Sequence, residues 1–427
     1  MPGFSGDLIL RNVLLLFLVV LLGTALVTVG FESLLRFITK EPKGPVKYQS
    51  HPTALVTLKP NLRRKHTAWG EMHYYRTNEV GVRDDSPLCE KPDVLLFGDS
   101  NLFAKSLPFD ETLGEQVEHS FNDEICSVNF GVPGYGPDQS LLRMLYEVDQ
   151  LELAPRVVVF HVFADNDYGD LFRNYLFTVD AAGKLQATNR NKTDYKLRTV
   201  ERLQAQYLLV RRLRDLAVDL DLYKLPADEY LSPNVDKPEQ PFGSKDEALR
   251  YIETVERITR SEFENYKDGK YTTWLGDSSD FYLALNPDSE AAHQAGQLLA
   301  GIFRAAKQKS NELNACFVVL IQPAESDVAE TGILSPVDLA RYSKAYKRSY
   351  HPRNLTDIAK RAAESAGVDY INLFDLYEKS EVPAYASFEL DKGDNHWNAA
   401  GVRIAAEALR SYIVENGCLG EEIVPTY

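Results

Sequence analysis

An apolar run near the N-terminus, over residues 13–30, contains neither a charged residue nor a proline. Together with the apolar residues that flank it, the run reaches the roughly 20 residues that a helix needs to cross a bilayer. A signal peptide would have a shorter apolar region and a small-x-small cleavage site, but this run passes into Phe31 and Glu32 without one. The pattern therefore predicts an uncleaved transmembrane anchor over residues 13–31, preceded by a tail over residues 1–12.

Further along the chain, short apolar runs alternate with segments of helical periodicity. The first block contains predicted strands at residues 94–97, 127–130 and 157–163, separated by predicted helices at 112–121 and 138–151. The alternation resumes later with helix 289–314, strand 315–321, helix 354–366, strand 369–373 and helix 402–415. Strands joined through helices form a parallel sheet with right-handed crossovers. The pattern therefore predicts an α/β domain with a central parallel sheet, built from residues 91–170 and 288–418.

Two regions do not follow this alternation. Residues 32–90 contain scattered prolines and one short strand pattern at 73–78, and we interpret them as a connecting region. Residues 171–287 contain a hairpin pattern at 177–185 and two segments of helical periodicity, at 195–222 and 245–266. We interpret this stretch as a mostly helical insertion, which is a candidate for a cap over the domain.

The composition narrows the choice of partners. The formal net charge of −15 leaves no broad basic face to neutralise phosphates, so we expect no nucleic-acid partner. The same charge argues against a polyanionic glycan held by charge alone. The four cysteines are widely spaced and lack the paired spacing of a zinc site, so we expect no structural metal, and nothing in the sequence indicates a cofactor.

The first predicted strand ends in Gly98, Asp99 and Ser100. The carboxyl ends of strands in open α/β sheets are where binding sites form. Gly-Asp-Ser is also ordinary turn chemistry, and by itself this stretch is better interpreted as a turn. Ser100 becomes a candidate nucleophile only if the chain also provides a base and a group that orients it.

A base and an acid occur together before the last predicted helix, at Asp394 and His396. An aspartate two residues before a histidine, in a turn, can reach the imidazole from the same loop. For an isolated Asp-x-His the simpler interpretation is a helix cap with a solvated histidine. His161, by contrast, lies in the middle of a predicted strand and is expected in the core.

An acyl-transfer site also needs donors for the oxyanion that forms in the transition state. Gly134, in a loop after the second strand, can present its backbone N–H closely because it has no Cβ. Asn166 can offer its side-chain amide from the loop after the third strand, and the Ser100 N–H is a further candidate donor. Each signal is weak by itself, and their order along successive strands strengthens them.

These segments together resemble the four sequence blocks of the SGNH/GDSL hydrolases. The blocks are Gly98-Asp99-Ser100, then Asn129-Phe130-Gly131-Val132-Pro133-Gly134, then Asn166-Asp167, then Asp394-x-His396. The resemblance implies a three-layer, flavodoxin-like domain in which Ser100 is the nucleophile and His396 the base, oriented by Asp394. It also implies an oxyanion hole formed by Ser100, Gly134 and Asn166. The segment from Arg76 to Asp84 is similar to one found in membrane-anchored bacterial members.

The chain departs from the family pattern at several positions. Ala164 stands where the third block usually has glycine, and Asn101 follows the serine where leucine or phenylalanine is commoner. The acid lies two residues before the histidine instead of three, and Asp391 is a spare acid that could substitute for it. Asp-x-His-Trp is similar to the alginate O-acetyltransferase branch, which leaves hydrolase and transferase both open.

Three functions follow from these residues. The first is a membrane-anchored serine esterase that removes an acyl group from a carbohydrate or lipid outside the cytoplasm. The second is an O-acetyltransferase that modifies a cell-surface polysaccharide, with the insertion excluding water from the acyl-enzyme. The third is a non-catalytic glycan-binding protein on the same fold. Protein partners cannot be assigned from the sequence.

Two observations point to opposite orientations of the predicted anchor in the membrane. Lys and Arg are more frequent after the apolar run than before it, which would place the domain in the cytoplasm. The family resemblance implies the opposite side, which we adopt.

An oxidising compartment permits a disulfide, and Cys89 and Cys126 each precede a predicted strand. If those strands are neighbours the two cysteines can pair, and otherwise they are buried, inert thiols.

Overall fold

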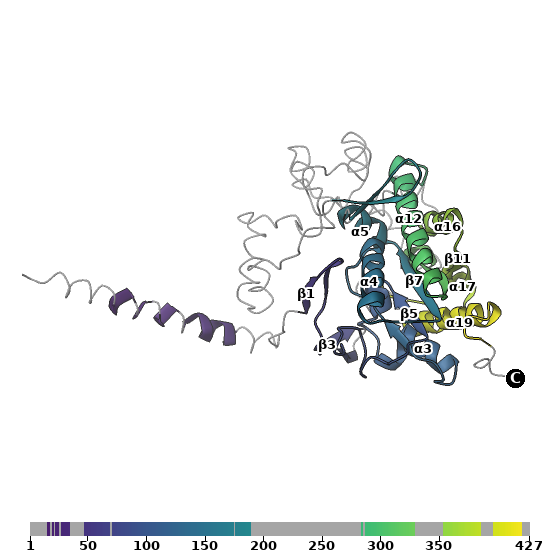
Figure 1. Ribbon diagram of the computed structural model, residues 1–427. Coiled ribbons are helices and arrows are strands. Elements are labelled where there is room, and N and C mark those ends of the chain that lie inside the picture. The colour runs from purple at the N-terminus through teal and green to yellow at the C-terminus, as the bar shows by residue number, and fades with distance from the viewer. Residues whose placement is uncertain are drawn as a thin grey trace, which may run out of the picture. The chain divides into compact units, whose positions relative to one another are not determined.

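A computed structural model describes eleven stretches of the chain, and it is shown in Figure 1. These stretches are residues 15–17, 19–20, 22–24, 27–34, 47–68, 71–174, 176–188, 283–284, 287–328, 353–385 and 396–420. The chain divides into two compact units, Met1–Lys47 with Lys196–Leu225, and Tyr48–Tyr195 with Pro226–Tyr427. The predicted helical segments at 195–222 and 245–266 lie outside the described residues.

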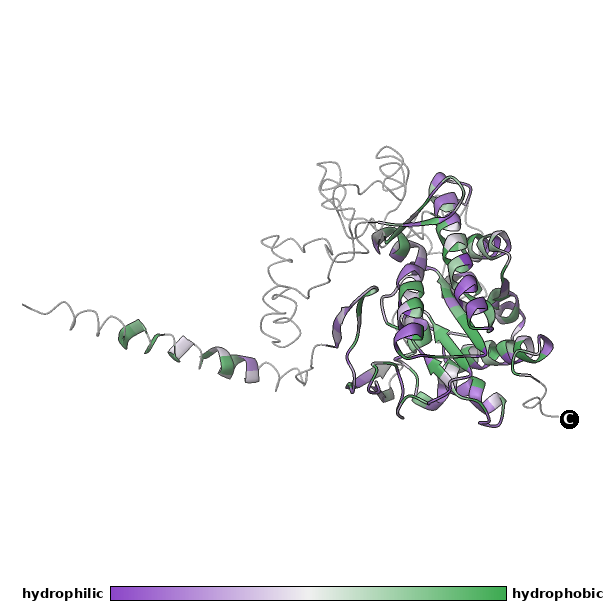
Figure 2. Ribbon diagram, in the orientation of Figure 1, coloured by the Kyte–Doolittle hydropathy of each residue, from purple (hydrophilic) through white to green (hydrophobic). Residues whose placement is uncertain are grey.

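The described part of the first unit is an N-terminal helix, Leu15–Leu34, in which hydrophobic residues predominate and hydrophilic residues lie at the C-terminal end (Figure 2). Its hydroxyl side chains bond back to the helix, as the Thr24 Oγ1 does to the Val20 carbonyl at 2.7 Å. Such bonds satisfy polar groups inside the helix, as an apolar environment requires. The helix is long and apolar enough to span a membrane or to be a signal sequence.

The second unit contains a five-stranded parallel sheet with the order β11-β10-β7-β5-β6. Its strands are β5 (Val94–Phe97), β6 (Ser127–Asn129), β7 (Val157–Ala164), β10 (Cys316–Pro323) and β11 (Asp369–Asn372). Numbered along the chain, this is the 2-1-3-4-5 order of doubly wound folds. The predicted α/β fold with a central parallel sheet is therefore confirmed. The chain changes winding direction between β5 and β7, and the carboxyl ends of these two strands flank the crevice where such folds bind ligands.

Helices cover both faces of this sheet, because its strands are apolar on both sides. Leu95 and Phe97 of β5 belong to the core on one face, and Val94 and Leu96 belong to the core on the other. The first face is covered by α4 (Pro137–Gln150), α5 (Asn166–Asn174), α12 (Glu290–Glu312) and α16 (Asn354–Ala366). The second is covered by α3 (Leu113–Ser120), α17 (Leu373–Lys379) and α19 (Ala399–Glu415).

Smaller elements complete the second unit. Two antiparallel pairs precede the sheet, formed by β1 (Tyr48–His51) with β2 (Leu55–Leu58) and by β3 (Arg63–Ala68) with β4 (Glu71–Arg76). The predicted hairpin is present as β8 (Phe177–Val179) and β9 (Leu185–Ala187). Short helical turns are α2 (Ser100–Phe103), η1 (Phe109–Glu111) and α13 (Glu325–Val328).

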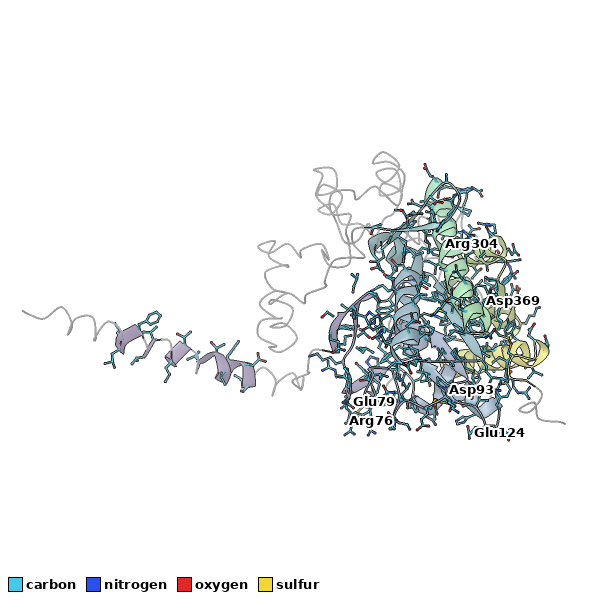
Figure 3. All side chains as sticks on the ribbon, viewed as in Figure 1. Arg76, Glu79, Asp93, Glu124, Arg304 and Asp369 are labelled. Carbon is cyan, nitrogen blue, oxygen red and sulfur yellow. A yellow bond between two sulfur atoms is a disulfide. The ribbon has the colours of Figure 1, made fainter. Side chains whose placement is uncertain are left out.

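Covalent and ionic links hold the amino-terminal edge of the sheet. Cys89 pairs with Cys126, which the adjacency of β5 and β6 allows, and the structure adds a second disulfide between Cys316 and Cys418. Asp93, labelled in Figure 3, directly precedes β5, and Arg156 directly precedes β7. The Asp93 carboxylate accepts two hydrogen bonds from the Arg156 guanidinium, at 2.7 and 2.9 Å. These links lie at the edge opposite to the one where Ser100 follows β5.

Candidate active site

Ser100 begins the single-turn helix α2, which follows β5 after Gly98 and Asp99. The Asp99 side chain caps this helix by accepting a hydrogen bond from the Asn101 N–H at 2.9 Å. Gly98 is required here, because a Cβ on it would lie 2.9 Å from the Cβ of His161 on the neighbouring strand β7. The predicted turn is thus the start of a short capped helix, which holds Ser100 at the carboxyl edge of the sheet.

Arg83 supports the other end of the same helix. Its guanidinium is buried and donates to the carbonyls of Phe103, Ala104 and Leu107, the last at 2.6 Å. Burial lowers the pKa of Arg83 to about 10, so the group stays charged at neutral pH. The carbonyl end of a helix carries partial negative charge, which a guanidinium stabilises. The segment from Arg76 to Asp84 therefore acts on the site by bracing the helix that begins with Ser100.

The turn that precedes Arg83 is built by its own side chains. The Asn78 Oδ1 accepts from the Val80 N–H at 3.1 Å, and the Thr77 hydroxyl donates to the Lys59 carbonyl at 2.6 Å. Gly81 has a φ of +80° and a Cβ there would lie 2.6 Å from the Leu58 carbonyl oxygen. The local backbone geometry therefore explains why Asn78 and Gly81 occur in the segment from Arg76 to Asp84.

The structure brings Ser100 and His396 together although 296 positions separate them. The Ser100 Oγ lies 2.9 Å from the His396 Nε2, within the distance for direct proton transfer. The same Oγ lies 3.4 Å from the Asp99 Oδ2. Both residues are partly exposed, so a substrate can reach the hydroxyl from solvent. Asp394 and Asp391 lie outside the described residues, and the orienting acid stays a prediction.

The predicted oxyanion donors follow the strands on either side of β5. Gly134 has a φ of +84°, and a Cβ there would meet nothing within 4 Å, so its backbone borders open space. Its loop is bonded to the start of the turn that contains Ser100, because the Val132 N–H donates to the Gly98 carbonyl at 3.1 Å. Asn166 begins α5, and its amide donates to the Asp170 Oδ2 at 2.8 Å. The role of both residues at an oxyanion stays a prediction.

The sequence argument gave no role to several buried side chains next to Ser100. Asn101, Gln322, Tyr385 and Trp397 are buried and hydrogen-bonded to one another next to Ser100. Gln322 could have been noticed, because it is a polar residue near the carboxyl end of an otherwise apolar strand. His161 is buried as predicted, and burial lowers the pKa of its imidazole while the nearby Asp99 raises it.

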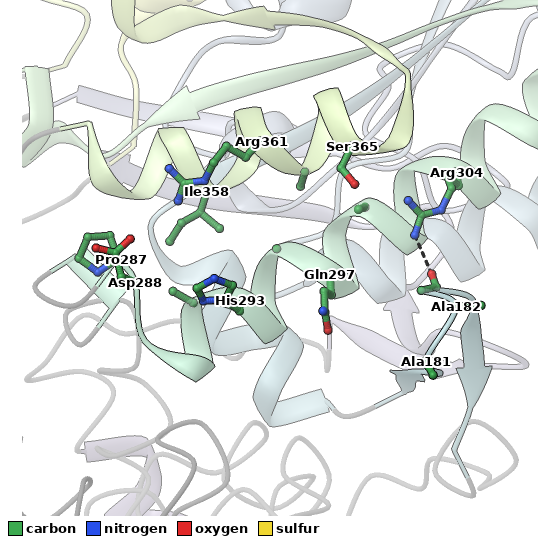
Figure 4. A pocket seen from close by; sticks show the side chains of 15 residues that line it. Ala181, Ala182, Pro287, Asp288, His293, Gln297, Arg304, Ile358, Arg361 and Ser365 are labelled. Atoms are coloured by element: carbon green, nitrogen blue, oxygen red, sulfur yellow. Dashed lines mark hydrogen bonds between the residues drawn. The ribbon is translucent and has the colours of Figure 1, made fainter.

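A separate cavity of about 630 Å³ lies between the β8–β9 hairpin and helices α12 and α16 (Figure 4). Arg304 lines one end, where it donates to the Gly183 carbonyl at 2.6 Å. Of the predicted catalytic residues that the structure describes, neither Ser100 nor His396 lines this cavity. Within the ranges that the structure describes, no group of three or more His, Cys, Asp or Glu side chains could hold a metal ion.

The comparisons with known proteins give no family. No family model matches the chain, and no curated protein matches it. Among solved structures, a carbohydrate acetylesterase family member from Sinorhizobium meliloti has 9% identity and a TM-score of 0.31, covering 77% of this chain and 99% of its own. LAE5, an alpha/beta hydrolase enzyme from the metagenome of Lake Arreo in Spain, has 12% identity and a TM-score of 0.31, covering 77% of this chain and 96% of its own.

Proposed function

We propose that this chain is a serine esterase of the SGNH type, anchored in a membrane, that hydrolyses an O-acyl ester of a carbohydrate or lipid. The observation that carries the proposal is the 2.9 Å contact between the Ser100 Oγ and the His396 Nε2 at the carboxyl edge of the sheet. A serine is a poor nucleophile without a base at this distance, and with one it can form an acyl-enzyme.

In the proposed reaction, His396 accepts the Ser100 proton as the Oγ attacks the ester carbonyl carbon. The C–O bond to the leaving group then breaks, and the protonated His396 gives its proton to that oxygen, which leaves as an alcohol. Water, deprotonated by His396, then attacks the acyl carbon of the acyl-enzyme. The bond from that carbon to the Ser100 Oγ breaks as the protonated His396 returns its proton to the Oγ, which releases the carboxylic acid and restores both residues. Asp394 holds the imidazole in the tautomer that this proton transfer needs.

Charge develops on the carbonyl oxygen when Ser100 attacks. Backbone N–H groups and amides held in place before the reaction stabilise that charge. The Ser100 N–H, the Gly134 N–H and the Asn166 amide are the proposed donors. For Asn166 the proposal requires its amide to turn from the Asp170 carboxylate toward the substrate.

The site is proposed to lie outside the cytoplasm, with the Leu15–Leu34 helix as the anchor. Two disulfides support this placement, because disulfides form and persist in oxidising compartments. Protease treatment of intact cells tests it. Digestion of the domain is expected, and complete protection until the cells are lysed would reverse the orientation.

The activity test uses the full chain in detergent with short acyl esters and acetylated sugars. Ser100→Ala is expected to reduce kcat by more than about 1,000-fold, and His396→Ala by a similar factor, because the two residues act as a unit. Ser120→Ala is the control, since the Ser120 hydroxyl only donates to the Val117 carbonyl on α3. Full activity in Ser100→Ala would refute the proposed nucleophile.

Product analysis in the presence of a glycan acceptor distinguishes the two reaction classes that share this site. Release of the acyl group to water supports the esterase, and its transfer to the sugar would replace the esterase by an O-acetyltransferase. Glycan binding without any Ser100-dependent turnover would instead indicate a non-catalytic glycan-binding protein.

A further inference from the structure

A continuous chain of buried hydrogen bonds connects strand β10 to the residue that follows His396. We propose that Gln322, through Asn101 and Trp397, is a positioning residue that fixes the base His396 relative to the nucleophile. This inference rests on the proposed function of Ser100 and His396.

The first link joins the residue after the nucleophile to the residue after the base. The Trp397 backbone N–H donates to the Asn101 Oδ1 at 3.3 Å, and the Trp397 indole Nε1–H donates to the Asn101 carbonyl at 2.9 Å. Asn101 directly follows Ser100, and Trp397 directly follows His396. Two bonds between these neighbours therefore limit how far the Oγ and the imidazole can separate.

The second link is Gln322, near the end of β10. Its Nε2 donates to the Asn101 Oδ1 at 3.0 Å and to the Tyr385 hydroxyl at 2.9 Å. Its Oε1 lies 2.7 Å from the His161 Nε2 on the neighbouring strand. Gln322 is fully buried, so no water competes for these bonds. One amide thus ties two adjacent strands to the site.

In this series of buried hydrogen bonds, the donor and acceptor of each bond follow from those of the bond before it. A backbone N–H can only donate, so Asn101 must present its oxygen to Trp397. Gln322 must then present its NH₂ to Asn101, which is consistent with the Tyr385 hydroxyl donating to the Pro323 carbonyl. The Gln322 oxygen consequently faces His161, whose Nε2 must carry a proton. A residue that cannot both donate and accept at position 322 breaks this order.

Hydrogen bonds also link Gln322 to the residues on either side of the segment that contains the predicted acid, one directly and one through Asn101. Tyr385 and Trp397 flank residues 386–396, which contain Asp394 and His396, and they form a β-bridge with each other. Gln322 binds the Tyr385 hydroxyl directly and reaches Trp397 through Asn101. A single buried side chain therefore restrains both flanks of the segment that supplies the base.

The test compares Gln322→Met, which keeps the length of the side chain but loses its hydrogen bonds, with the parent protein in detergent. A small displacement of a catalytic group lowers kcat strongly, so we expect a loss of about 10- to 100-fold with KM changed less than about 3-fold. Ser310→Ala is the control for a lost buried polar group, since the Ser310 hydroxyl only donates within α12, to Ala306. Its kcat is expected to stay unchanged.

A double-mutant cycle separates positioning from general destabilisation. If Gln322 acts through the base, Gln322→Met causes no further loss of kcat in a His396→Ala background. An equal loss in both backgrounds would overturn the inference while leaving the proposed function intact. Full activity of Gln322→Met would overturn it as well.

A readout that needs no activity completes the test. Hydrogen exchange at the Trp397 amide, followed by mass spectrometry, is expected to be faster in Gln322→Met, because its acceptor Asn101 is no longer held. Peptides from α12 serve as the internal reference. Unchanged exchange would contradict the inference even if Ser100→Ala shows that the chain is not an esterase.

Discussion

At the scale of single residues, the position of Ser100 depends on side chains that hold the short helix α2 at both of its ends. Asp99 caps the first turn of α2, and Arg83 donates to the Phe103 and Ala104 carbonyls at its other end. Because α2 is only four residues long, its own backbone bonds cannot keep it in place. The position of the Ser100 hydroxyl is therefore set by buried side chains outside the helix.

Arg83→Met tests this bracing. The substitution leaves the carbonyls of Phe103, Ala104 and Leu107 buried without their donor. We expect the free energy of unfolding to fall by roughly 2–4 kcal/mol and kcat to fall as well. Urea unfolding measures the first quantity, with the exposed Arg403→Met as the control expected within about 0.5 kcal/mol of the parent. Equal stability of the two variants would contradict the role of Arg83.

At the scale of elements, the loop after β6 packs directly on the turn that contains Ser100. A Cβ at Gly131 would lie 2.7 Å from the Phe103 backbone nitrogen and 3.1 Å from the Asp99 carbonyl oxygen. Only glycine allows this approach. The second sequence block therefore has a packing role next to Ser100 in addition to any role of Gly134 at the oxyanion.

Gly131→Ala is expected to push α2 away from its place. The overlap should cost roughly 1–3 kcal/mol of stability and lower kcat by displacing the Ser100 hydroxyl. Gly296→Ala on α12 is the matched control, because the nearest atom to its added Cβ is 3.9 Å away. Alanine is the better helix former there, so that variant should be as stable as the parent or more so. Thermal unfolding and ester hydrolysis of both variants measure the difference.

At the scale of the whole molecule, the stability should depend on pH through Asp138 at the start of α4. This carboxyl is fully buried, and burial raises its pKa to about 7 from an ordinary value of 3.8. Between these two pH values the folded protein holds a proton that the unfolded chain releases. Stability from this group is therefore present at low pH and is lost as pH rises toward 7, by at most about 4 kcal/mol.

Asp138→Asn removes the titrating group and nearly preserves its shape. The unfolding free energy of the variant, minus that of the parent, is expected to increase between pH 5 and pH 8. Urea unfolding at several pH values provides both quantities. A difference that does not change with pH would show that Asp138 is not protonated in the folded protein.

Sequence patterns predict the sheet well because its strands are buried on both faces. The strand at residues 94–97 was predicted with its observed bounds, and the helix at 138–151 differs from α4 by one residue at each end. Helix α5 was missed because its first turn is rich in polar residues that also suit a loop. The α2 helix was expected as a turn, because one helical turn leaves no periodic pattern.

The contact between Ser100 and His396 was anticipated only from the order of the sequence blocks, since no local pattern links residues this far apart. The Cys316–Cys418 disulfide and the bonds of Gln322 could not be predicted from single positions. Each joins segments that become neighbours only when the sheet is assembled. The choice of substrate in the proposed function likewise depends on the shape of the surface around Ser100, which short sequence motifs do not encode.

Covalent labelling by a serine-reactive phosphonate tests the central claim most directly. The full chain in detergent is treated with the probe, digested, and mapped by mass spectrometry. We expect one label per chain on Ser100, lost in Ser100→Ala and slowed in His396→Ala, because the base activates the hydroxyl. Labelling at another serine, or no labelling of the folded protein, would contradict the account.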